Sequence, residues 1–295
     1  MTVRLSLETM PEPALPLTGQ VALITGACGG IGRACAISLA RAGADIAAND
    51  VGVLTRETQT KSSAADIGPD DTRLSAAARS LAADIVALGR RVRLLPVDVS
   101  DQAAVDAMVT HTVQALGRID IFVSCAVYSD REPFTTADMT GFRRTIDVSM
   151  WGSFYALRAC ANQMIRQGNG GNVVIVGSPH AVIAFPNCMA YNMAKAAQDQ
   201  MARTAAMELL PHNIRVNIVH PGWTDTPGER KFFSEDDLKK AGATLPAGRL
   251  ARPDEIARGV AFLVDPASAY INGITLGIEG GLALPWWSKR GSGTL

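Results

Sequence analysis

Tyr191 and Lys195 lie four residues apart in the stretch YNMAK, and together they could exchange a proton with a bound substrate. On a helix this spacing places the two side chains on one face, one turn apart. A tyrosine phenol has a pKa near ~10 and is a poor proton carrier at neutral pH by itself. A lysine ammonium one turn away favours the phenolate and lowers that pKa. The pair is therefore a candidate general acid and base for an alcohol or a carbonyl.

Ser178 is a second candidate, because it directly follows residues 172–177, an apolar run with the length of a buried strand. The ends of strands are where sites form in open α/β sheets. A loop containing Pro186 then returns the chain to the tyrosine. Many surface helices carry a tyrosine and a lysine at this spacing, so the pair alone is weak evidence. The serine at the strand end and the glycine motif described next strengthen it.

The segment TGACGGIG, residues 25–32, stands between a short apolar strand at 21–24 and an alanine-rich helix that extends to about Ala42. Glycines allow the backbone to turn tightly and approach a phosphate, and the helix N-terminus offers free N–H groups. The spacing is GxxxGxG rather than the common GxGxxG. A tight turn without a ligand is the alternative, but the position after the first strand of an α/β pattern favours a phosphate site. We interpret Cys28 within this turn as a small residue rather than as a redox-sensing thiol.

Asp50 closes a second expected strand, residues 45–49, and stands 18 residues after Gly32. A carboxylate at this point can accept hydrogen bonds from the adenosine ribose hydroxyls and would repel a 2′-phosphate. The sequence therefore predicts NAD rather than NADP as the cofactor. An ordinary turn residue at the end of a strand is the alternative.

Strands and helices alternate along the chain, which predicts a single α/β domain with a doubly wound, Rossmann-like parallel sheet. This domain is expected over residues 18–283, between an N-terminal tail at 1–17 and a C-terminal tail at 284–295. Residues 51–73 form an enlarged polar segment without clear periodicity. Further strands are expected at 92–95, 119–123, 215–219 and 274–278. Helices are expected at about 74–88, 101–116, 138–167, 191–210, 234–240 and 254–264.

The composition excludes several classes of protein. Lys+Arg and Asp+Glu both number 28, so there is no basic surface for nucleic acid or an anionic membrane. No apolar run approaches the roughly 20 residues of a membrane span, and the N-terminus lacks a signal-peptide pattern. The five cysteines form no CxxC pair, which is typical of reduced thiols in the cytoplasm. No metal site is predicted.

With these motifs the chain resembles the short-chain dehydrogenase/reductase family over about residues 18–283. The resemblance rests on TGACGGIG, on the Asp98-Val99 pair, on a serine 13 residues before the tyrosine, on YNMAK and on the Pro221-Gly222 turn. It implies that Ser178 orients the substrate oxygen, that Tyr191 is the general acid/base, and that Lys195 binds the nicotinamide ribose and lowers the tyrosine pKa. It also implies a cofactor site made of Gly26, Cys28, Gly30, Ile31, Gly32, Asp50, Asp98, Val99, Ala126, Tyr191, Lys195, Pro221, Gly222, Thr224 and Thr226.

The resemblance further implies an NAD-dependent oxidoreductase that interconverts a secondary alcohol, such as a sugar or polyol, and a ketone. The expected partner is a small-molecule substrate, and the expected assembly is a homotetramer or homodimer. His180 and Trp223 are candidates for the substrate pocket, although a purely structural histidine explains His180 equally well. The alternative function is a catalytically weak NAD-binding sensor or scaffold.

Three features depart from the family pattern. The fourth strand usually ends in Asn-Asn-Ala-Gly, whereas here residues 124–127 read SCAV. The family's Val-Asn-x-x-Gly pattern reads VSMWG at 148–152, so Ser149 replaces the asparagine of a catalytic tetrad. A backbone carbonyl at this position could keep the asparagine's role in holding a proton path. The interval from Asp50 to Asp98 spans 48 positions and is longer than usual, as in the mycofactocin-associated branch.

Two adjacent tryptophans, Trp286 and Trp287, follow the expected end of the domain. Tryptophan buries a large area and is enriched at protein interfaces. We expect the pair to pack against a neighbouring subunit, and packing on their own subunit is the alternative.

Overall fold

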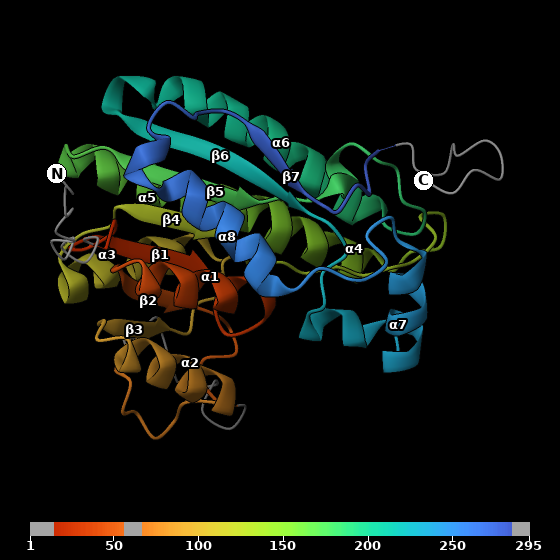
Figure 1. Cartoon of the computed structure of the whole chain (residues 1–295), viewed down its shortest axis with the longest axis horizontal. Coiled ribbons are helices and arrows are strands. Elements are labelled where there is room, and N and C mark those ends of the chain that lie inside the picture. The colour runs from red at the N-terminus through yellow and green to blue at the C-terminus, as the bar shows by residue number, and fades with distance from the viewer. Residues whose placement is uncertain (1–14, 56–66, 285–295) are drawn as a thin grey trace, which may run out of the picture.

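The computed structural model describes residues 15–55 and 67–284, and within them a parallel sheet of seven strands forms the centre (Figure 1). The strand order is β3-β2-β1-β4-β5-β6-β7, with every pair parallel. The strands are β1 (Val21–Thr25), β2 (Asp45–Asn49), β3 (Val92–Leu95), β4 (Ile121–Ser124), β5 (Gly171–Val176), β6 (Ile214–Pro221) and β7 (Thr275–Ile278). The order reverses between β1 and β4, so the doubly wound α/β class is confirmed. Ligands of such sheets bind beyond the carboxyl ends of the strands at this reversal.

Helices cover both faces of the sheet and bury one hydrophobic cluster on each side. One cluster is formed with α1 (Gly30–Arg41), α2 (Ala76–Ala87) and α8 (Pro253–Val264). The other is formed with α3 (Gln102–Leu116), α5 (Gly152–Gln167) and α6 (Met189–Glu208). The central strands are buried along their whole length, as expected for parallel strands covered on both faces. Two more helices, α4 (Met139–Ile146) and α7 (Glu235–Thr244), complete the described α-helices, and α7 stands apart from the sheet (Figure 1).

Local sequence signals set the ends of several helices. The side chains of Ser75, Asp101 and Asp138 accept hydrogen bonds from the first amides of α2, α3 and α4, so they act as N-caps. Gly117 and Gly168 adopt left-handed backbone conformations, with φ of 94° and 72°, and end α3 and α5.

The long helix predicted over residues 138–167 is interrupted in the structure. A π-helical turn, Asp147–Trp151, lies between α4 and α5 and contains Ser149. Such turns are frequent at functional sites. The next residue, Gly152, lies so close to Val99 that an added Cβ would come within 2.6 Å of the Val99 Cγ2 atom. Close packing of this helix on the segment after β3 therefore requires glycine at position 152.

The described ends of the enlarged segment cover the outer edge of the sheet. Ile67 pairs antiparallel with Leu94 of the edge strand β3, and Leu54 pairs antiparallel with Leu74. All four side chains are buried. Covering an edge strand satisfies backbone groups that would otherwise be open to another chain. Residues 56–66 lie outside the described residues.

The predicted tails are described only in part. In the N-terminal tail, Leu17 is buried in the core and its N–H donates to the Ala42 carbonyl. Residues 1–14 and 285–295 lie outside the described residues, and the latter include Trp286 and Trp287. Within the described ranges no helix is long and apolar enough to cross a membrane.

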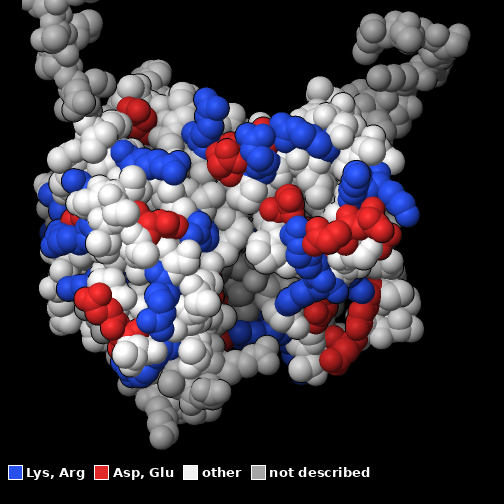
Figure 2. Space-filling view, turned by 60° about the horizontal axis from the view of Figure 1, so that its bottom comes forward, with Lys and Arg blue, Asp and Glu red and all other residues white. Residues whose placement is uncertain are grey.

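The surface carries charges of both signs. Figure 2 shows lysine and arginine side chains interspersed with aspartate and glutamate over one face of the molecule. Many of these charges form ion pairs, such as Arg33 with Asp84 and Arg249 with Glu255. In the described part of the chain, no cluster of three histidine, cysteine or carboxylate residues could hold a metal ion.

Candidate active site

The structure brings Ser178, Tyr191 and Lys195 together beyond the carboxyl end of β5. One residue separates Ser178 from the end of β5, and Ser178 is buried. Helix α6 begins two residues before Tyr191. The Ser178 side chain lies close enough to the Tyr191 hydroxyl to lower its pKa. The Lys195 Nζ atom lies 5.4 Å from the centre of the Tyr191 ring. The three side chains that the sequence singles out thus form one cluster.

Burial controls the protonation of this cluster. Burial raises the pKa of Tyr191 above its ordinary value, and the nearby Ser178 side chain acts in the opposite direction. Burial also lowers the pKa of Lys195 to about 8, against smaller opposing effects of Cys125 and Asp199. The lowering of the tyrosine pKa by the lysine, expected from the spacing, does not prevail here, because removing the phenolate from water costs more.

Ser149 holds the loop after β4 through its side chain. Its hydroxyl donates to the Tyr128 carbonyl at 2.8 Å and accepts from the Tyr128 N–H at 3.1 Å. Its own carbonyl accepts hydrogen bonds from Gln198 and Ser153. The residue is fully buried. The hydroxyl therefore has a positioning task, while the carbonyl points towards the lysine side of the site.

The glycine turn comes close to two other loops. Gly26 has φ of 68°, and an added Cβ would lie 2.9 Å from the Ala126 nitrogen. A Cβ on Gly32 would lie 2.1 Å from the Gly26 oxygen, and one on Gly30 would lie 3.1 Å from the Thr226 side chain. Because a side chain at any of these three positions would crowd the neighbouring atoms, the three glycines allow the backbone of the turn to be approached closely.

These features fit a nicotinamide dinucleotide. The residue before α1 is Gly29, which has no side chain to cap the first amides of the helix. Amides at such a helix end, together with the positive end of the helix dipole, are suited to bind a pyrophosphate. Ile31 belongs to the first turn of this helix. Gly26, Gly30, Ile31 and Gly32 would therefore hold the phosphates, with Ala126 and Thr226 beside them.

Asp50 lies at the end of β2, where the adenosine end of such a cofactor would be held. Its carboxylate accepts hydrogen bonds from the N–H groups of Cys28, at 3.1 Å, and Gly52, at 2.7 Å. Burial and the nearby Asp50 raise the pKa of the Cys28 thiol to about 12. Because a thiol must ionise to react, Cys28 is suited to packing, as the sequence indicates.

Asp98 forms an ion pair that the sequence does not reveal. The Asp98 carboxylate accepts from the N–H and hydroxyl of Ser100 and from Arg144 Nη2, the last at 2.6 Å. Burial raises the pKa of Asp98, but these hydrogen bonds outweigh it and hold that pKa below its ordinary value. The neighbouring Val99 is buried against Gly152.

The segment after β6 folds back over the site. The Gly222 N–H donates to the Ile278 carbonyl at 2.9 Å, which joins the Pro221-Gly222 turn to β7. The Thr224 hydroxyl donates to the Gly222 carbonyl at 2.8 Å, and Thr224 forms a parallel bridge with Ala251. This segment brings Thr226 to the glycine turn.

Aromatic and charged side chains lie near Tyr191. His180 stacks on Phe185, with ring centres 4.1 Å apart, and meets Tyr191 edge-on at 4.9 Å. Trp223 donates through Nε1 to Glu229 at 2.9 Å. His180 therefore contacts the Tyr191 ring directly, whereas Trp223 bonds to Glu229, whose charge acts on Tyr191.

Arg131 and Glu229 also lie near Tyr191, and the sequence gives no signal for either. Their side chains form an ion pair at 3.2 Å, and the Arg131 guanidinium lies 4.1 Å from the centre of the Phe232 ring. Both charges influence the pKa of Tyr191, in opposite directions. They stand far apart in the sequence, so no local pattern could have placed them together.

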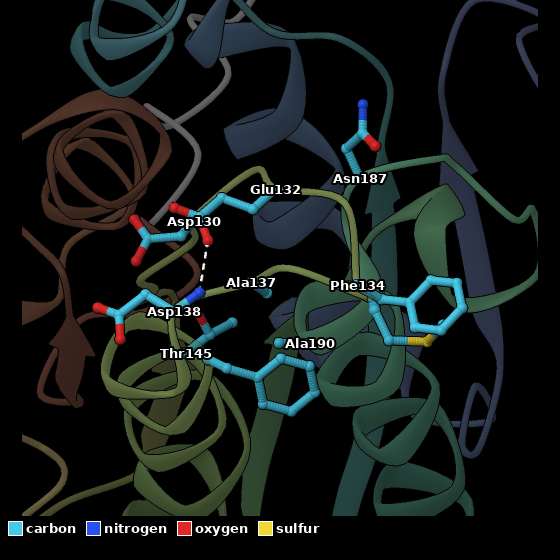
Figure 3. Close-up of a pocket in the computed structure, with 10 residues that line it drawn as sticks. Asp130, Glu132, Phe134, Ala137, Asp138, Thr145, Asn187 and Ala190 are labelled. Carbon is cyan, nitrogen blue, oxygen red and sulfur yellow. Dashed lines mark hydrogen bonds between the residues drawn. The ribbon is translucent and has the colours of Figure 1, made fainter.

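Two cavities flank the site without containing the catalytic cluster. A small one, of about 20 Å³, lies between the loop after β4 and the start of α6; Glu132 accepts there from the Asp138 N–H at 2.7 Å (Figure 3). A larger one, of about 230 Å³, is lined by Gly222, Trp223 and residues 277–280.

Comparison with known proteins supports the resemblance to the short-chain dehydrogenase/reductase family. A family model described as enoyl-(acyl carrier protein) reductase matches residues 70–283. L-rhamnose 1-dehydrogenase (NAD(P)(+)) of Sphingomonas sp. (strain SKA58) is 32% identical over 267 residues, which cover 90% of this chain and 97% of that protein. Short-chain dehydrogenase/reductase eriH of Hericium erinaceus is 32% identical over 261 residues, covering 88% and 96%. The structure of carveol dehydrogenase from Mycobacterium avium in complex with NAD has a TM-score of 0.79 and 29% identity, covering 91% and 99%.

The fold and site are those of an oxidoreductase that acts on alcohol and carbonyl groups. The chain belongs to the short-chain dehydrogenase/reductase family. The resemblance seen in the sequence is thereby confirmed.

Proposed function

We propose that this protein is an NAD-dependent oxidoreductase that interconverts a secondary alcohol and a ketone, with Tyr191 as general acid/base. The observation that carries the proposal is the cluster in which Tyr191 lies near the buried side chains of Ser178 and Lys195. The cluster stands at the edge of the sheet that also carries the glycine turn. A reacting carbon held there could therefore meet both a proton carrier and a cofactor.

Each residue has a chemical task in this proposal. Nicotinamide, when bound, accepts or supplies the hydride. Ser178 donates to the substrate oxygen and orients it. Tyr191 removes the hydroxyl proton in oxidation and returns it in reduction. Lys195, when charged, favours the phenolate form of Tyr191.

Asp50 supports NAD as the preferred cofactor. Its carboxylate would stand next to a 2′-phosphate with like charge, and no arginine or lysine lies between Gly26 and Gly32 to offset it. The first basic residue after the turn, Arg33, pairs with Asp84 and Ser80 instead.

His180 supports a hydroxyl-rich substrate, such as a sugar or polyol. The Asn192 Nδ2 group donates to the Phe185 carbonyl at 2.9 Å, so Asn192 Oδ1 faces His180 Nδ1, at 2.6 Å. His180 Nδ1 must then be the donor. Burial lowers the pKa of His180 to about 4, so the ring is neutral and Nε2 is an acceptor. Nε2 has no partner within the described residues and could accept a hydrogen bond from a second substrate hydroxyl.

Exposed aromatic side chains support a homotetramer or homodimer. Trp151 and Phe154 are 43% and 37% exposed at the start of α5, and their rings are in edge contact with centres 6.0 Å apart. Exposed apolar patches on a soluble protein commonly mark a contact with another chain. The five cysteines are free, which supports the cytoplasm as the compartment.

The test is a screen of sugars, polyols and simple secondary alcohols with NAD and NADP, followed by the absorbance of the reduced cofactor. Substrate-dependent NADH formation that Tyr191→Phe abolishes is the expected result. Tight NAD binding without turnover of any alcohol would instead support the alternative, a catalytically weak NAD-binding sensor or scaffold. The replacement of the family asparagine by Ser149 is the feature that supports this alternative.

A further inference from the structure

Gln198 lies one turn beyond Lys195 on α6 and is buried. Its Oε1 atom accepts a hydrogen bond from Lys195 Nζ at 3.0 Å. Its Nε2 atom donates to the Ser149 carbonyl and to the Ser153 hydroxyl, both at 2.6 Å. The other acceptor of Lys195 is the Val176 carbonyl, at 2.7 Å. Gln198 therefore joins the lysine to the π-helical turn.

The orientation of the Gln198 amide follows from its partners. An ammonium group can only donate hydrogen bonds, and a backbone carbonyl can only accept them. The opposite orientation would set Nε2 against the Lys195 ammonium and Oε1 against the Ser149 carbonyl. Only one arrangement satisfies every partner, and it uses both N–H groups of the amide. A fully satisfied buried network of this kind holds its members rigidly.

We propose that Gln198 is a positioning residue that fixes the charged end of Lys195 beside Tyr191. Two of the three Lys195 donors are directed to Val176 and Gln198. The third N–H group of Lys195 has no partner within the described residues. It is therefore available to donate a hydrogen bond where the reaction takes place. In this chain a side chain, Gln198, makes the link between Lys195 and the Ser149 carbonyl.

The amide oxygen also opposes the effect of burial on Lys195. Burial lowers the pKa of Lys195 to about 8, because the ammonium is removed from water. A carbonyl oxygen at 3.0 Å favours the charged form and limits this lowering. The ionisable groups around the lysine are Cys125 after β4, Tyr191 and Asp199 on α6, and His180 after β5.

The kinetic consequence rests on the proposed role of Tyr191. Without the Gln198 oxygen, Lys195 loses its proton at lower pH and no longer favours the phenolate. The pKa of Tyr191 then rises, so alcohol oxidation, which needs the phenolate, requires higher pH. Gln198 acts on the reaction only through Lys195.

The first test is the pKa of Lys195 in Gln198→Met, which keeps the length of the side chain and removes the amide. The chain has only six lysines, so ¹³Cε-lysine NMR can follow each one with pH; Lys195→Arg assigns the signal. A hydrogen bond to a charged group corresponds to roughly one to two pKa units. We expect the pKa of Lys195 to fall by about this amount.

Gln200→Met is the matched control, because Gln200 is on the same helix and exposed. It should leave the Lys195 titration unchanged. If Gln198→Met does not fold, Gln198→Glu decides the matter, since a carboxylate beside the ammonium should raise the pKa of Lys195. A Lys195 pKa that neither variant moves overturns the proposal.

The second test is the pH profile of kcat/KM for alcohol oxidation, with an alcohol found active in the screen. The low-pH limb should move to higher pH in Gln198→Met and stay in place in Gln200→Met. A loss of activity with an unmoved limb would show a merely structural role and contradict the proposal. If no alcohol is turned over, the proposed function fails, whereas the NMR titration still decides the role of Gln198.

Discussion

The Ser149 hydroxyl and the Tyr128 backbone form a reciprocal pair of hydrogen bonds, at 2.8 and 3.1 Å. This pair joins the π-helical turn to the loop after β4, which also contains Ala126. Ser149 replaces the family's asparagine, and its hydroxyl both donates and accepts a hydrogen bond. The Ser149 carbonyl accepts a hydrogen bond from Gln198, which in turn accepts one from Lys195. The side chain and the carbonyl of Ser149 therefore have separate tasks.

Ser149→Ala should retain most activity and lose stability. The variant keeps the carbonyl but leaves the partly buried N–H and carbonyl of Tyr128 without this partner, which costs about 1–3 kcal/mol. Urea unfolding measures the loss, and initial rates with NAD measure activity. A fall in turnover as large as that of Tyr191→Phe would show that the hydroxyl itself carries the proton.

Tyr191→Phe should lower kcat by roughly 10²–10⁴, the range typical of general acid/base catalysis. The ring and its contact with His180 remain, so NAD binding, measured by fluorescence titration, should be unchanged. Tyr270→Phe is the control, because that side chain is fully exposed. Near-normal turnover in Tyr191→Phe would require another proton carrier.

Asp50→Asn should increase kcat/KM for NADP by about tenfold or more, since a change of ~1.4 kcal/mol corresponds to that factor. The asparagine can still accept hydrogen bonds from the amides of Cys28 and Gly52 but carries no charge. Asp45→Asn is the matched control at the opposite end of β2, where Asp45 pairs with Arg91 on the surface. A wild-type enzyme that uses the two cofactors equally would show that Asp50 does not face the ribose.

The sheet is predictable from the sequence because each parallel strand is an apolar run set between helices. Residues 45–49 and 92–95 form β2 and β3 over the ranges expected. The local pattern cannot show where a helix deforms. The π-helical turn at Ser149 is followed by Gly152, which packs against Val99 of a distant segment, and the local pattern shows neither feature.

The candidate site is predictable where one short segment carries the chemistry. The spacing of Tyr191 and Lys195 places them together on α6, and Ser178 lies two residues after the end of β5. Gln198 escapes prediction, because a glutamine in an alanine-rich helix resembles a surface residue. It is buried beside Ser149 of the π-helical turn and Ser153 of α5, which only the tertiary structure brings beside α6. The Arg131–Glu229 pair escapes for the same reason.

His180→Phe should raise KM for a hydroxyl-rich substrate by about 5- to 13-fold, the effect expected when a hydrogen bond of roughly 1–1.5 kcal/mol is lost. KM for a simple secondary alcohol should change little, because that substrate has no second hydroxyl for Nε2. Burial holds the pKa of His180 near 4, so its acceptor remains available as the pH rises above that value. The wild-type KM should therefore show no inflection between pH 5.5 and 7.5, a window around the ordinary histidine pKa of ~6.5. An inflection there that His180→Phe removes would contradict the neutral ring.

The aromatic residues at the start of α5 should contribute to a contact between subunits. Trp151→Ser together with Phe154→Ser removes the exposed rings while leaving Tyr155, which packs against the core. We expect the wild-type chain to sediment as a dimer or tetramer and the double variant to sediment as a smaller species. Truncation after Ala283 tests the separate expectation for Trp286 and Trp287, and it should weaken the oligomer while leaving NAD binding in place. Phe262→Ser is the control, because that side chain is 51% exposed on α8, which covers the opposite face of the sheet. A double variant that keeps the wild-type sedimentation would place the subunit contact elsewhere on the molecule.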